Sequence, residues 1–378
     1  MRLSIFRAMA AASLLLTLSC GEERGKEPDN GPWTDPAAEI TFAKGADVSW
    51  VSEMEKDGKV FRKADGSAAD IFAVLSGCGI NSIRLRVWVD PYGGWSGKAD
   101  MVALAKRAAA AGMAVMADLH YGDFFADPSR QKIPAAWEQD NADMDKMCSH
   151  VSAHTKDVLE ALKAAGVSPR WIQVGNETRN GMLWPAGQLW TESGDIVDGR
   201  KHFAKLYNAG YDAAKAVYPH AIVMPHLNNA FEDNLWWFQQ IKAQGGKFDM
   251  IALSHYPQAQ QGKTAAQMNQ QALNNVTHLA QTLGVPVIIS EVGVKTFASE
   301  ATAKQVLNSF VTSLRNLKGC AGVFYWEPEV DGVWKPALYS DVSAIAQYTG
   351  KSETWNPYDM GAFTHSGAPT SVMEVFEY

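Results

Sequence analysis

The stretch "KADMVALAKRAAAAGMAVMADLH", residues 98–120, joins two different patterns at a glycine. Its first part has apolar residues at helical spacing, is rich in good helix formers and contains no proline, so it predicts a helix. Gly112 follows at the place where helices commonly end. The run from Ala114 to His120 is short and mainly apolar, which is typical of a buried strand. The stretch therefore predicts a helix followed directly by a strand with polar residues at its end.

The same alternation recurs along the chain. Eight apolar runs are predicted as strands, and each but the last is followed by a helix-like stretch: Phe42–Val48, Ser82–Val89, Ala114–His120, Trp171–Gly175, Ala221–His226, Met250–Ser254, Val285–Ile289 and Gly322–Trp326. Such repeated alternation predicts an α/β fold with a single (β/α)8 TIM barrel over residues 39–378, and a doubly wound open sheet is the alternative. A length of 378 residues suits one such domain.

The first residues have the character of an export signal. Arg2 and Arg7 precede an apolar segment that is too short to span a membrane, so we expect a signal peptide over residues 1–19. Cys20 follows in a loose lipobox, which predicts lipid attachment there and a flexible tether over residues 20–38. The expected location is exported and lipid-anchored, at the cell surface or outer membrane of a Gram-negative bacterium. Ordinary secretion with an incidental Cys20 is the alternative.

The composition narrows the class of ligand. A net charge of -7 disfavours binding to nucleic-acid phosphates, and thirteen Trp offer flat faces on which sugar rings can stack. Cys78, Cys148 and Cys320 show no CxxC spacing, so no zinc site is predicted. We expect a monomer with a neutral ligand and no required cofactor.

A barrel carries its active site at the carboxyl ends of its strands. Polar and aromatic residues gather at these ends in the predicted strand order: Asp47; Arg84, Arg86 and Trp88; Asp118 and His120; Asn176 and Glu177; His226 and Asn228; His255 and Tyr256; Glu291; and Trp326 and Glu327. The opposite ends are mainly Gly, Ala and Lys. This asymmetry predicts a polar site at one mouth of the barrel.

Two of these residues have the chemistry of a glycosidase. Glycoside hydrolysis requires two carboxyl groups on either side of one bond, and Glu177 and Glu291 meet this requirement if strands four and seven face each other. Aromatic neighbours and the charge of Glu291 would raise the pKa of Glu177 and keep it protonated as an acid. Asn176 would then contact the 2-hydroxyl of the sugar that is cleaved.

Longer motifs carry a family resemblance. They are "KGADVSWVSEME", "GINSIRLRVWVDP", "DLHYGDFFADPSRQKIPAAW", "WIQVGNETRNGMLWPAG", "LSHYP" and "FYWEP". Together, over about Phe42 to Trp334, they resemble glycoside hydrolase family 53, the endo-β-1,4-galactanases. The resemblance implies a retaining clan A (β/α)8 glycosidase that cleaves β-1,4-galactan and the type I arabinogalactan side chains of pectin into galacto-oligosaccharides.

The resemblance also implies roles for individual residues. Glu177 is expected to be the acid/base and Glu291 the nucleophile, with Tyr256 hydrogen-bonded to Glu291. Arg84 or Arg86, and His120, would complete the charge network around the nucleophile, and Trp326 would form a platform under the cleaved sugar. Further candidates for substrate contact or support are Asp47, Trp88, Asp118, Trp184, His255 and Trp334.

Several alternatives stay open at this point. A mannanase or glucanase of the same clan would share both glutamates, and a lipid-anchored glycan-binding protein would capture the polysaccharide without cleaving it. A metal-dependent hydrolase is disfavoured because His120, His226 and His255 do not fall in ligand spacings. Structural calcium is not predicted, although Glu327, Glu329 and Asp331 lie close together in the sequence. The balance between endo and exo action is open.

Overall fold

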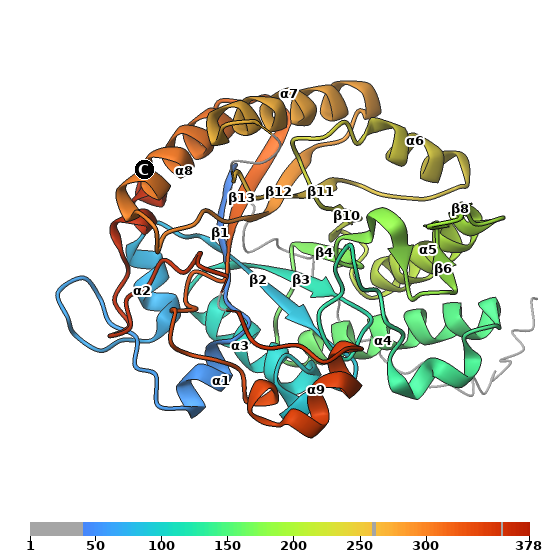
Figure 1. Cartoon of the computed structure of the whole chain (residues 1–378), viewed down its shortest axis with the longest axis horizontal. Coiled ribbons are helices and arrows are strands. Elements are labelled where there is room, and N and C mark those ends of the chain that lie inside the picture. Colours follow the sequence, from blue (N-terminus) through green and yellow to red (C-terminus); the bar gives the residue numbers. More distant parts are fainter. Residues whose placement is uncertain (1–40, 259–261, 357) are drawn as a thin grey trace, which may run out of the picture. The chain divides into compact units, whose positions relative to one another are not determined.

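The computed structural model describes residues 41–258, 262–356 and 358–378, and a parallel sheet lies at its centre (Figure 1). The strand order is β10-β11-β12-β13-β1-β2-β3-β4-β9. β9 pairs with β4 and β10 pairs with β11, and because β9 and β10 are halves of one segment interrupted at Pro225, the sheet closes into a barrel. The predicted (β/α)8 barrel is confirmed. Its strands are β1 (Ala43–Asp47), β2 (Ser82–Val87), β3 (Ala114–Leu119), β4 (Trp171–Val174), β9 (Ile222–Met224), β10 (His226–Leu227), β11 (Ile251–His255), β12 (Val287–Val292) and β13 (Cys320–Trp326).

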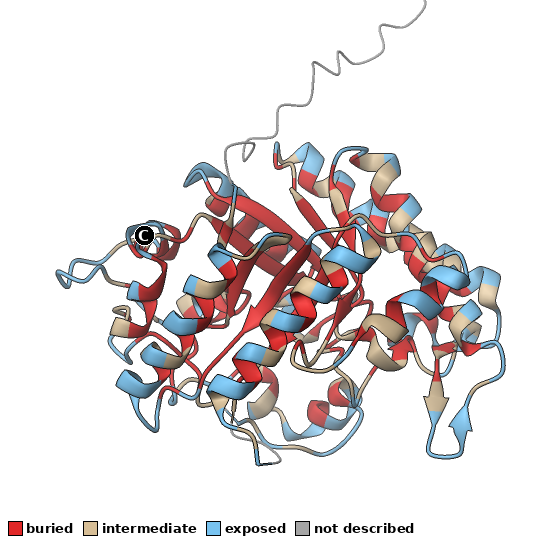
Figure 2. Cartoon of the chain, turned by 90° about the horizontal axis from the view of Figure 1, so that it is seen from above, coloured by how far each residue is buried: buried red, intermediate tan, exposed pale blue. Residues whose placement is uncertain are grey.

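Helices cover the outside of the barrel, with their buried residues toward the sheet (Figure 2). They are α1 (Val51–Lys56), α2 (Ile71–Gly77), α3 (Lys98–Ala110), α4 (Met144–Ala164), α5 (Gly199–Val217), α6 (Leu235–Ala243), α7 (Ala265–Leu283), α8 (Glu300–Arg315) and α9 (Val342–Thr349). Short 3-10 turns are η1 (Tyr92–Gly94), η2 (Ala135–Asp140), η3 (Thr178–Asn180), η4 (Ala337–Ser340) and η5 (Ser371–Phe376), and two small hairpins after β4 pair β5 (Gly181–Met182) with β6 (Gly187–Gln188) and β7 (Trp190–Thr191) with β8 (Gly194–Asp195).

Local sequence signals set the ends of α7. Thr264 and Gln267 form a reciprocal capping box at its start, and Gly284 follows its end with a φ of 70°, a conformation that glycine adopts without steric cost. The predicted stop at this glycine is therefore confirmed.

Apart from shifts of one or two residues at strand ends, the structure differs from the sequence prediction at three places. The fifth strand was expected as one run, but Pro225 has no N–H to donate and divides it into β9 and β10. The seventh strand runs to Val292, so Glu291 lies within β12 and not after it. After β13 the chain forms α9, where no helix was predicted, because the Asp341 side chain caps a short apolar stretch.

The interior of the barrel changes character along the strands. At the amino ends it is apolar: Trp171 and Phe324 meet there with ring centroids 5.9 Å apart, and Gly45 leaves room for the Phe324 ring. Toward the carboxyl ends buried polar side chains replace the apolar ones. The barrel is therefore packed below and polar above, as in other barrels that carry a site at this end.

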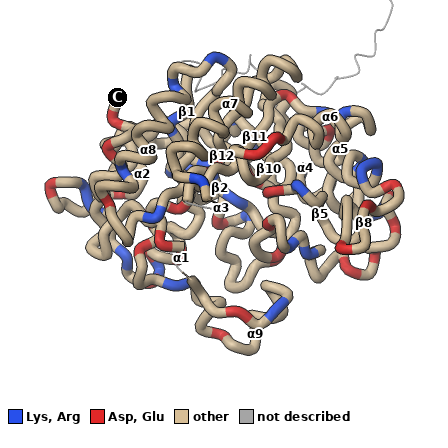
Figure 3. Tube along the Cα trace, turned by 45° about the horizontal axis from the view of Figure 1, so that its top comes forward, with Lys and Arg blue, Asp and Glu red and all other residues tan. Residues whose placement is uncertain are grey.

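Basic and acidic residues are interspersed along the chain (Figure 3). None of the helices among the described residues combines the length and the apolar character needed to cross a membrane. The predicted signal peptide over residues 1–19, Cys20 and the tether over residues 20–38 lie outside the described residues. Cys78, Cys148 and Cys320 are free thiols.

Candidate active site

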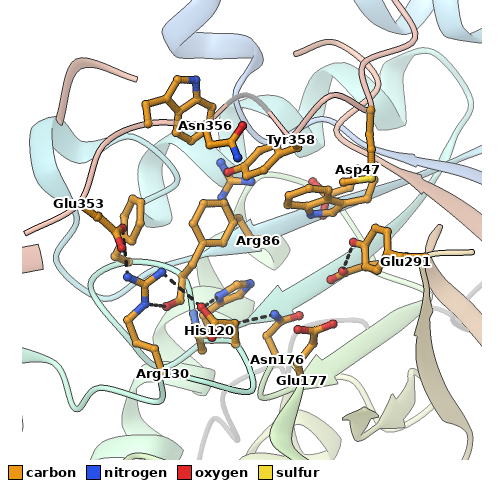
Figure 4. Close-up of a pocket in the computed structure, with 18 of the residues that line it drawn as sticks. Asp47, Arg86, His120, Arg130, Asn176, Glu177, Glu291, Glu353, Asn356 and Tyr358 are labelled. Carbon is orange, nitrogen blue, oxygen red and sulfur yellow. Dashed lines mark hydrogen bonds and ion pairs between the residues drawn. The ribbon is translucent and has the colours of Figure 1, made fainter. Parts of the chain in front are cut away.

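A cleft of about 540 Å³ opens at the carboxyl ends of the barrel strands (Figure 4). Nine of the residues predicted for the site line it: Asp47, Arg84, Arg86, His120, Asn176, Glu177, Tyr256, Glu291 and Trp326. The sequence therefore identified the floor of this cleft. The other predicted residues lie elsewhere and are placed below.

Arg84 is the charged centre of the cleft floor. Its side chain, 1% exposed, points from β2 into the barrel. Nη1 lies 2.7 Å from Asp47 Oδ2, and Nη2 lies 2.7 Å from Asp118 Oδ2 and 2.9 Å from Glu291 Oε1. One guanidinium thus serves three buried carboxylates, which suits its fixed array of donors. The alternative left open by the sequence is settled, because Arg84 contacts Glu291.

Arg86 has a different partner. Its Nη1 lies 2.5 Å from Glu327 Oε1, and its guanidinium lies 4.1 Å from the centroid of the Trp50 ring and 4.8 Å from that of Trp88. Trp88 does not line the cleft but covers this cation, an arrangement that is favourable in a desolvated site. Arg86 and Trp88 therefore support the wall of the cleft.

The pairing of β11 with β12 orients Glu291. The register shifts between Leu253 and Ser254, so that Ser254 lies opposite Glu291. Tyr256 Oη donates to Glu291 Oε2 at 2.6 Å, and Ser254 Oγ lies 3.2 Å from the same oxygen. With Arg84 on Oε1, both oxygens of Glu291 are held by donors.

Asn176 and Glu177 lie in a strained turn at the end of β4. Gly175 has a φ of 81° and Glu177 a φ of 46°, the latter uncommon for a residue with a side chain. Asn176 Oδ1 accepts from Arg84 Nη2 at 2.8 Å and from Gln173 Nε2 at 3.1 Å, while its Nδ2 donates to the Ala126 carbonyl at 2.8 Å. These bonds fix the turn and direct Glu177 into the cleft.

The two glutamates face each other. One carboxylate oxygen of Glu177 and one of Glu291 lie within 4.8 Å of each other. Retaining glycosidases have carboxyl groups about 5–5.5 Å apart, whereas inverting enzymes leave room for a water at about 6.5–9.5 Å. The spacing therefore fits direct attack by one carboxylate on the sugar.

Electrostatics distinguish the two carboxyl groups. Burial, reinforced by the charge of Glu291, raises the pKa of Glu177 well above its usual value. Burial also raises the pKa of Glu291, but Arg84 and Tyr256 oppose that rise. We infer that Glu177 holds the proton of the pair and that Glu291 carries the charge.

A second layer of polar residues supports the floor. His226 contacts Asn176 Oδ1 through Nδ1 at 2.9 Å and Ser254 Oγ through Nε2 at 2.8 Å, and burial lowers its pKa well below the usual value, so the ring is neutral. His120 Nδ1 accepts from the Ala126 N–H at 3.1 Å, so Nε2 donates to Asp118 Oδ2 at 2.8 Å. Asp118 thus supports Arg84 from beneath the cleft.

The described residues do not fit a metal centre at this site. One group of described residues has metal-ligating atoms close enough together, and it consists of Glu177, His226 and Glu291. However, both His226 nitrogens already have partners, and the Arg84 guanidinium already pairs with Glu291. His255 lies apart, with Nε2 on Asn269 at 2.9 Å. The three histidines considered from the sequence therefore share no site.

The carboxylates considered for calcium also have other partners. Glu327 is paired with Arg86, and Asp331 Oδ2 lies 2.5 Å from Lys59 Nζ. Glu329 Oε1 accepts from the Trp50 N–H at 3.3 Å. These three side chains do not converge on one ligand site.

Two further predicted residues lie outside the cleft lining. Trp334 packs against Trp50 at a centroid distance of 5.4 Å and donates from Nε1 to Asp57. Trp184 lines a neighbouring cavity and donates from Nε1 to the Asn180 carbonyl. Trp326 itself forms part of an aromatic wall, with its ring 4.5 Å from that of Tyr358 and 6.0 Å from that of Tyr256.

Sequence reasoning missed two groups of residues. Gln173 and Ser254 complete the polar network inside the barrel, and a polar residue within an apolar run was the available signal for each. The second group lines the cleft from loops without periodicity: Arg130, Asn229, Phe231, Tyr339, Glu353, Trp355, Asn356 and Tyr358.

Comparisons with known proteins agree with this geometry. Residues 43–376 match the model of glycosyl hydrolase family 53. A probable arabinogalactan endo-β-1,4-galactanase A of Aspergillus terreus is 31% identical over 318 residues, 77% of this chain and 86% of the relative. An uncharacterized protein of Niallia circulans is 36% identical over 221 residues, and the match spans 58% of this chain and 60% of that protein. A solved structure from work on two fungal β-1,4-galactanases superposes with a TM-score of 0.72 at 27% identity, covering 89% of this chain and 99% of the other.

Proposed function

The chain belongs to glycosyl hydrolase family 53, and on that premise we propose that it hydrolyses β-1,4-galactosidic linkages in galactan and in the type I arabinogalactan side chains of pectin. The products are galacto-oligosaccharides. The observation that carries the proposal is the pair Glu177 and Glu291, with carboxylate oxygens within 4.8 Å of each other in a cleft that Arg84 polarises.

The geometry supports a double displacement. Glu291 attacks the anomeric carbon while the bond from that carbon to the leaving oxygen breaks, and Glu177 gives its proton to that oxygen. A covalent galactosyl-enzyme forms on Glu291. Water then attacks the same carbon while Glu177 takes a proton from that water, and the bond from the carbon to Glu291 breaks. Two successive inversions at this carbon retain its configuration. Arg84 and Tyr256 hold Glu291 ionised and aimed, and Trp326 supports the sugar from below.

The substrate is tested by comparing polysaccharides. The domain is incubated with linear β-1,4-galactan, mannan and carboxymethyl-cellulose, and the products are resolved by size over time. Galactose carries its 4-hydroxyl axially, so its β-1,4 chain bends, and a groove shaped for it rejects a flat chain. Oligosaccharides from galactan alone are the expected result. Cleavage of mannan or cellulose in place of galactan would assign the alternative substrate and overturn this one.

The roles of the two glutamates are tested by two variants. Glu177→Ala should lose activity mainly on substrates with poor leaving groups, because activated aryl galactosides need no proton to depart. Glu291→Ala should lose activity on both kinds of substrate, since the attacking group is gone. Equal losses on activated and natural substrates for both variants would contradict the roles. Binding of galactan without any cleavage by the unaltered chain would favour a glycan-binding protein.

We also propose that the protein is exported, anchored by a lipid on Cys20 and monomeric. The support is the charged and then apolar character of residues 1–19 and the loose lipobox that ends at Cys20. Metabolic labelling with a radioactive fatty acid should label the full chain and not a Cys20→Ala variant. Light scattering of the soluble domain tests whether it is monomeric. An unlabelled full chain would favour ordinary secretion.

A further inference from the structure

Arg130 separates the cleft from a second cavity. The second cavity measures about 380 Å³, and of the described residues that line either one, only Arg130 lines both. Its other lining residues come from the loop after β3, from Trp184 and from the end of α9: Ser129, Gln131, Lys132, Trp184, Thr349, Gly350 and Lys351. The Arg130 side chain is thus a partition between two spaces.

The partition is firmly held. Arg130 Nε donates to the Phe125 carbonyl at 3.2 Å, and Nη1 donates to the Thr349 carbonyl at 3.0 Å and to Glu353 Oε1 at 3.2 Å. Tyr339 Oη donates to the same Glu353 oxygen at 2.9 Å. The ion pair of Arg130 with Glu353 therefore joins the loop after β3 to the segment after α9. Figure 4 shows Arg130 and Glu353 facing each other on the side of the cleft away from Glu291.

A row of aromatic rings leads from the catalytic centre to this pair. The Trp326 ring lies 4.5 Å from that of Tyr358, Tyr358 lies 4.9 Å from Trp355, and Trp355 lies 5.2 Å from Tyr339. Tyr339 is the residue that holds Glu353. Such a row offers successive apolar faces to a chain of sugars and ends at Arg130 and Glu353.

The aromatic row marks one direction in which the substrate chain can extend. The sugar that becomes bound to Glu291 rests on Trp326. Further galactosyl units extend from there along Tyr358 and Trp355 toward Arg130.

We propose that Arg130, braced by Glu353, is the end wall of the part of the cleft lined by Tyr358, Trp355 and Tyr339, and that it sets how many galactosyl units the enzyme contacts there. This inference rests on the proposed galactanase function. A unit beyond the wall leaves into solvent, gains no contact and adds nothing to transition-state binding. The wall thereby sets the length of oligosaccharide at which the rate stops rising and the length of the main products.

Two substitutions at Arg130 distinguish a side chain that blocks the cleft by its bulk from one that only ties two segments together. Arg130→Ala removes the ionic ties and the bulk, whereas Arg130→Met removes the ties but keeps most of the bulk. The kcat/KM is measured for galacto-oligosaccharides of increasing length, together with the products of galactan. In the unaltered enzyme kcat/KM stops rising at a certain oligosaccharide length. For the Ala variant we expect kcat/KM to rise further, by about three- to tenfold, when one more galactosyl unit is added. A rise of that size corresponds to one added aromatic contact, at Trp184. The Met variant should reach its plateau at the unaltered length.

Lys132→Ala is the matched control. Lys132 Nζ donates to the Gln347 carbonyl at 2.9 Å and so also ties the loop after β3 to α9, but Lys132 lines the second cavity and not the cleft. This variant should keep the unaltered length dependence. The proposal would be overturned if kcat/KM of Arg130→Ala stopped rising at the unaltered length. It would also be overturned if the Ala and Met variants lost kcat/KM equally at every length. An unaltered enzyme that does not cleave galactan at all would instead overturn the proposed function.

Discussion

Arg84 Nη2 lies 2.9 Å from Glu291 Oε1, and this ion pair is buried on the floor of the barrel. The contact gives the two glutamates different environments, since Glu177 has no guanidinium at that distance among the described residues. A buried carboxylate beside a cation ionises more easily than one beside another carboxylate. In the proposed mechanism, the position of Arg84 therefore decides which glutamate attacks and which one carries the proton.

Replacing Arg84 by Met should raise the pKa of Glu291. Burial already raises that pKa and Arg84 opposes the rise, so without the cation the acidic limb of the kcat/KM profile should move to higher pH. We expect a loss of about 10²–10³ in kcat at neutral pH, as for other removed electrostatic groups. A pH profile of the variant measures both. An acidic limb in the unaltered place would contradict the role of Arg84.

Tyr256→Phe should slow catalysis and leave the fold intact. The change removes the 2.6 Å hydrogen bond to Glu291 Oε2 while Ser254 remains on the same oxygen. A hydrogen bond to a charged group is worth about 1.5–3 kcal/mol, which corresponds to about 10–100-fold in rate. Steady-state kinetics check the loss, and a thermal melt within a few degrees of the unaltered protein excludes unfolding as its cause. Unchanged kinetics would mean that the Tyr256 hydrogen bond does not assist Glu291.

The barrel, and the meeting of Glu177 and Glu291 in one cleft, could be predicted because local signals encode them. Apolar runs of strand length, helices with glycine stops and polar residues at strand ends all depend on neighbours in the sequence. Glu291 was identified although its strand was predicted too short, because it lies only two residues beyond the predicted end at Ile289 and so was still placed at the carboxyl end of that strand. The choice between Arg84 and Arg86 depended on side-chain direction inside the barrel, which alternation alone does not give.

The upper wall of the cleft could not be predicted from the sequence. Arg130, Glu353 and Trp355 come from long loops with no periodicity, and their positions depend on contacts between distant segments such as the ion pair of Arg130 with Glu353. The family resemblance made Trp88 and Trp334 candidates for substrate contact or support. In the structure they do not line the cleft but pack around Arg86 and Trp50.

Glu291→Gln should lower the pKa of Glu177. Burial is the main reason that the Glu177 pKa is raised, and the charge of Glu291 is the next. A neutral amide removes the second cause and keeps the first, so the pKa should fall part of the way toward its usual value. Infrared difference titration of the carboxyl bands of the inactive variant, with Glu291→Gln/Glu177→Gln as the reference, measures it. A Glu177 pKa that stays unchanged would mean that the two groups do not interact.

The buried carboxyl group of Glu53 should make the free energy of unfolding depend on pH. It is buried in α1, accepts from the Ala337 N–H, and burial raises its pKa from 4.5 to about 7. Between these values the folded state holds a proton that the unfolded chain releases, so this contribution is present below pH 4.5 and is lost as the pH rises through about 7. Its size is about 1–3 kcal/mol.

The variant Glu53→Gln isolates this contribution. The amide keeps an acceptor for Ala337 and does not titrate, so the free energy of unfolding should fall less between pH 5 and pH 8 than in the unaltered protein by about 1–3 kcal/mol. Urea unfolding at a series of pH values measures the difference. Glu55→Gln, on the same helix but in a half-exposed pair with Arg107, is the control and should keep the unaltered slope. Parallel curves for Glu53→Gln and the unaltered protein would show that Glu53 is ionised in the folded state, with its charge matched by its surroundings.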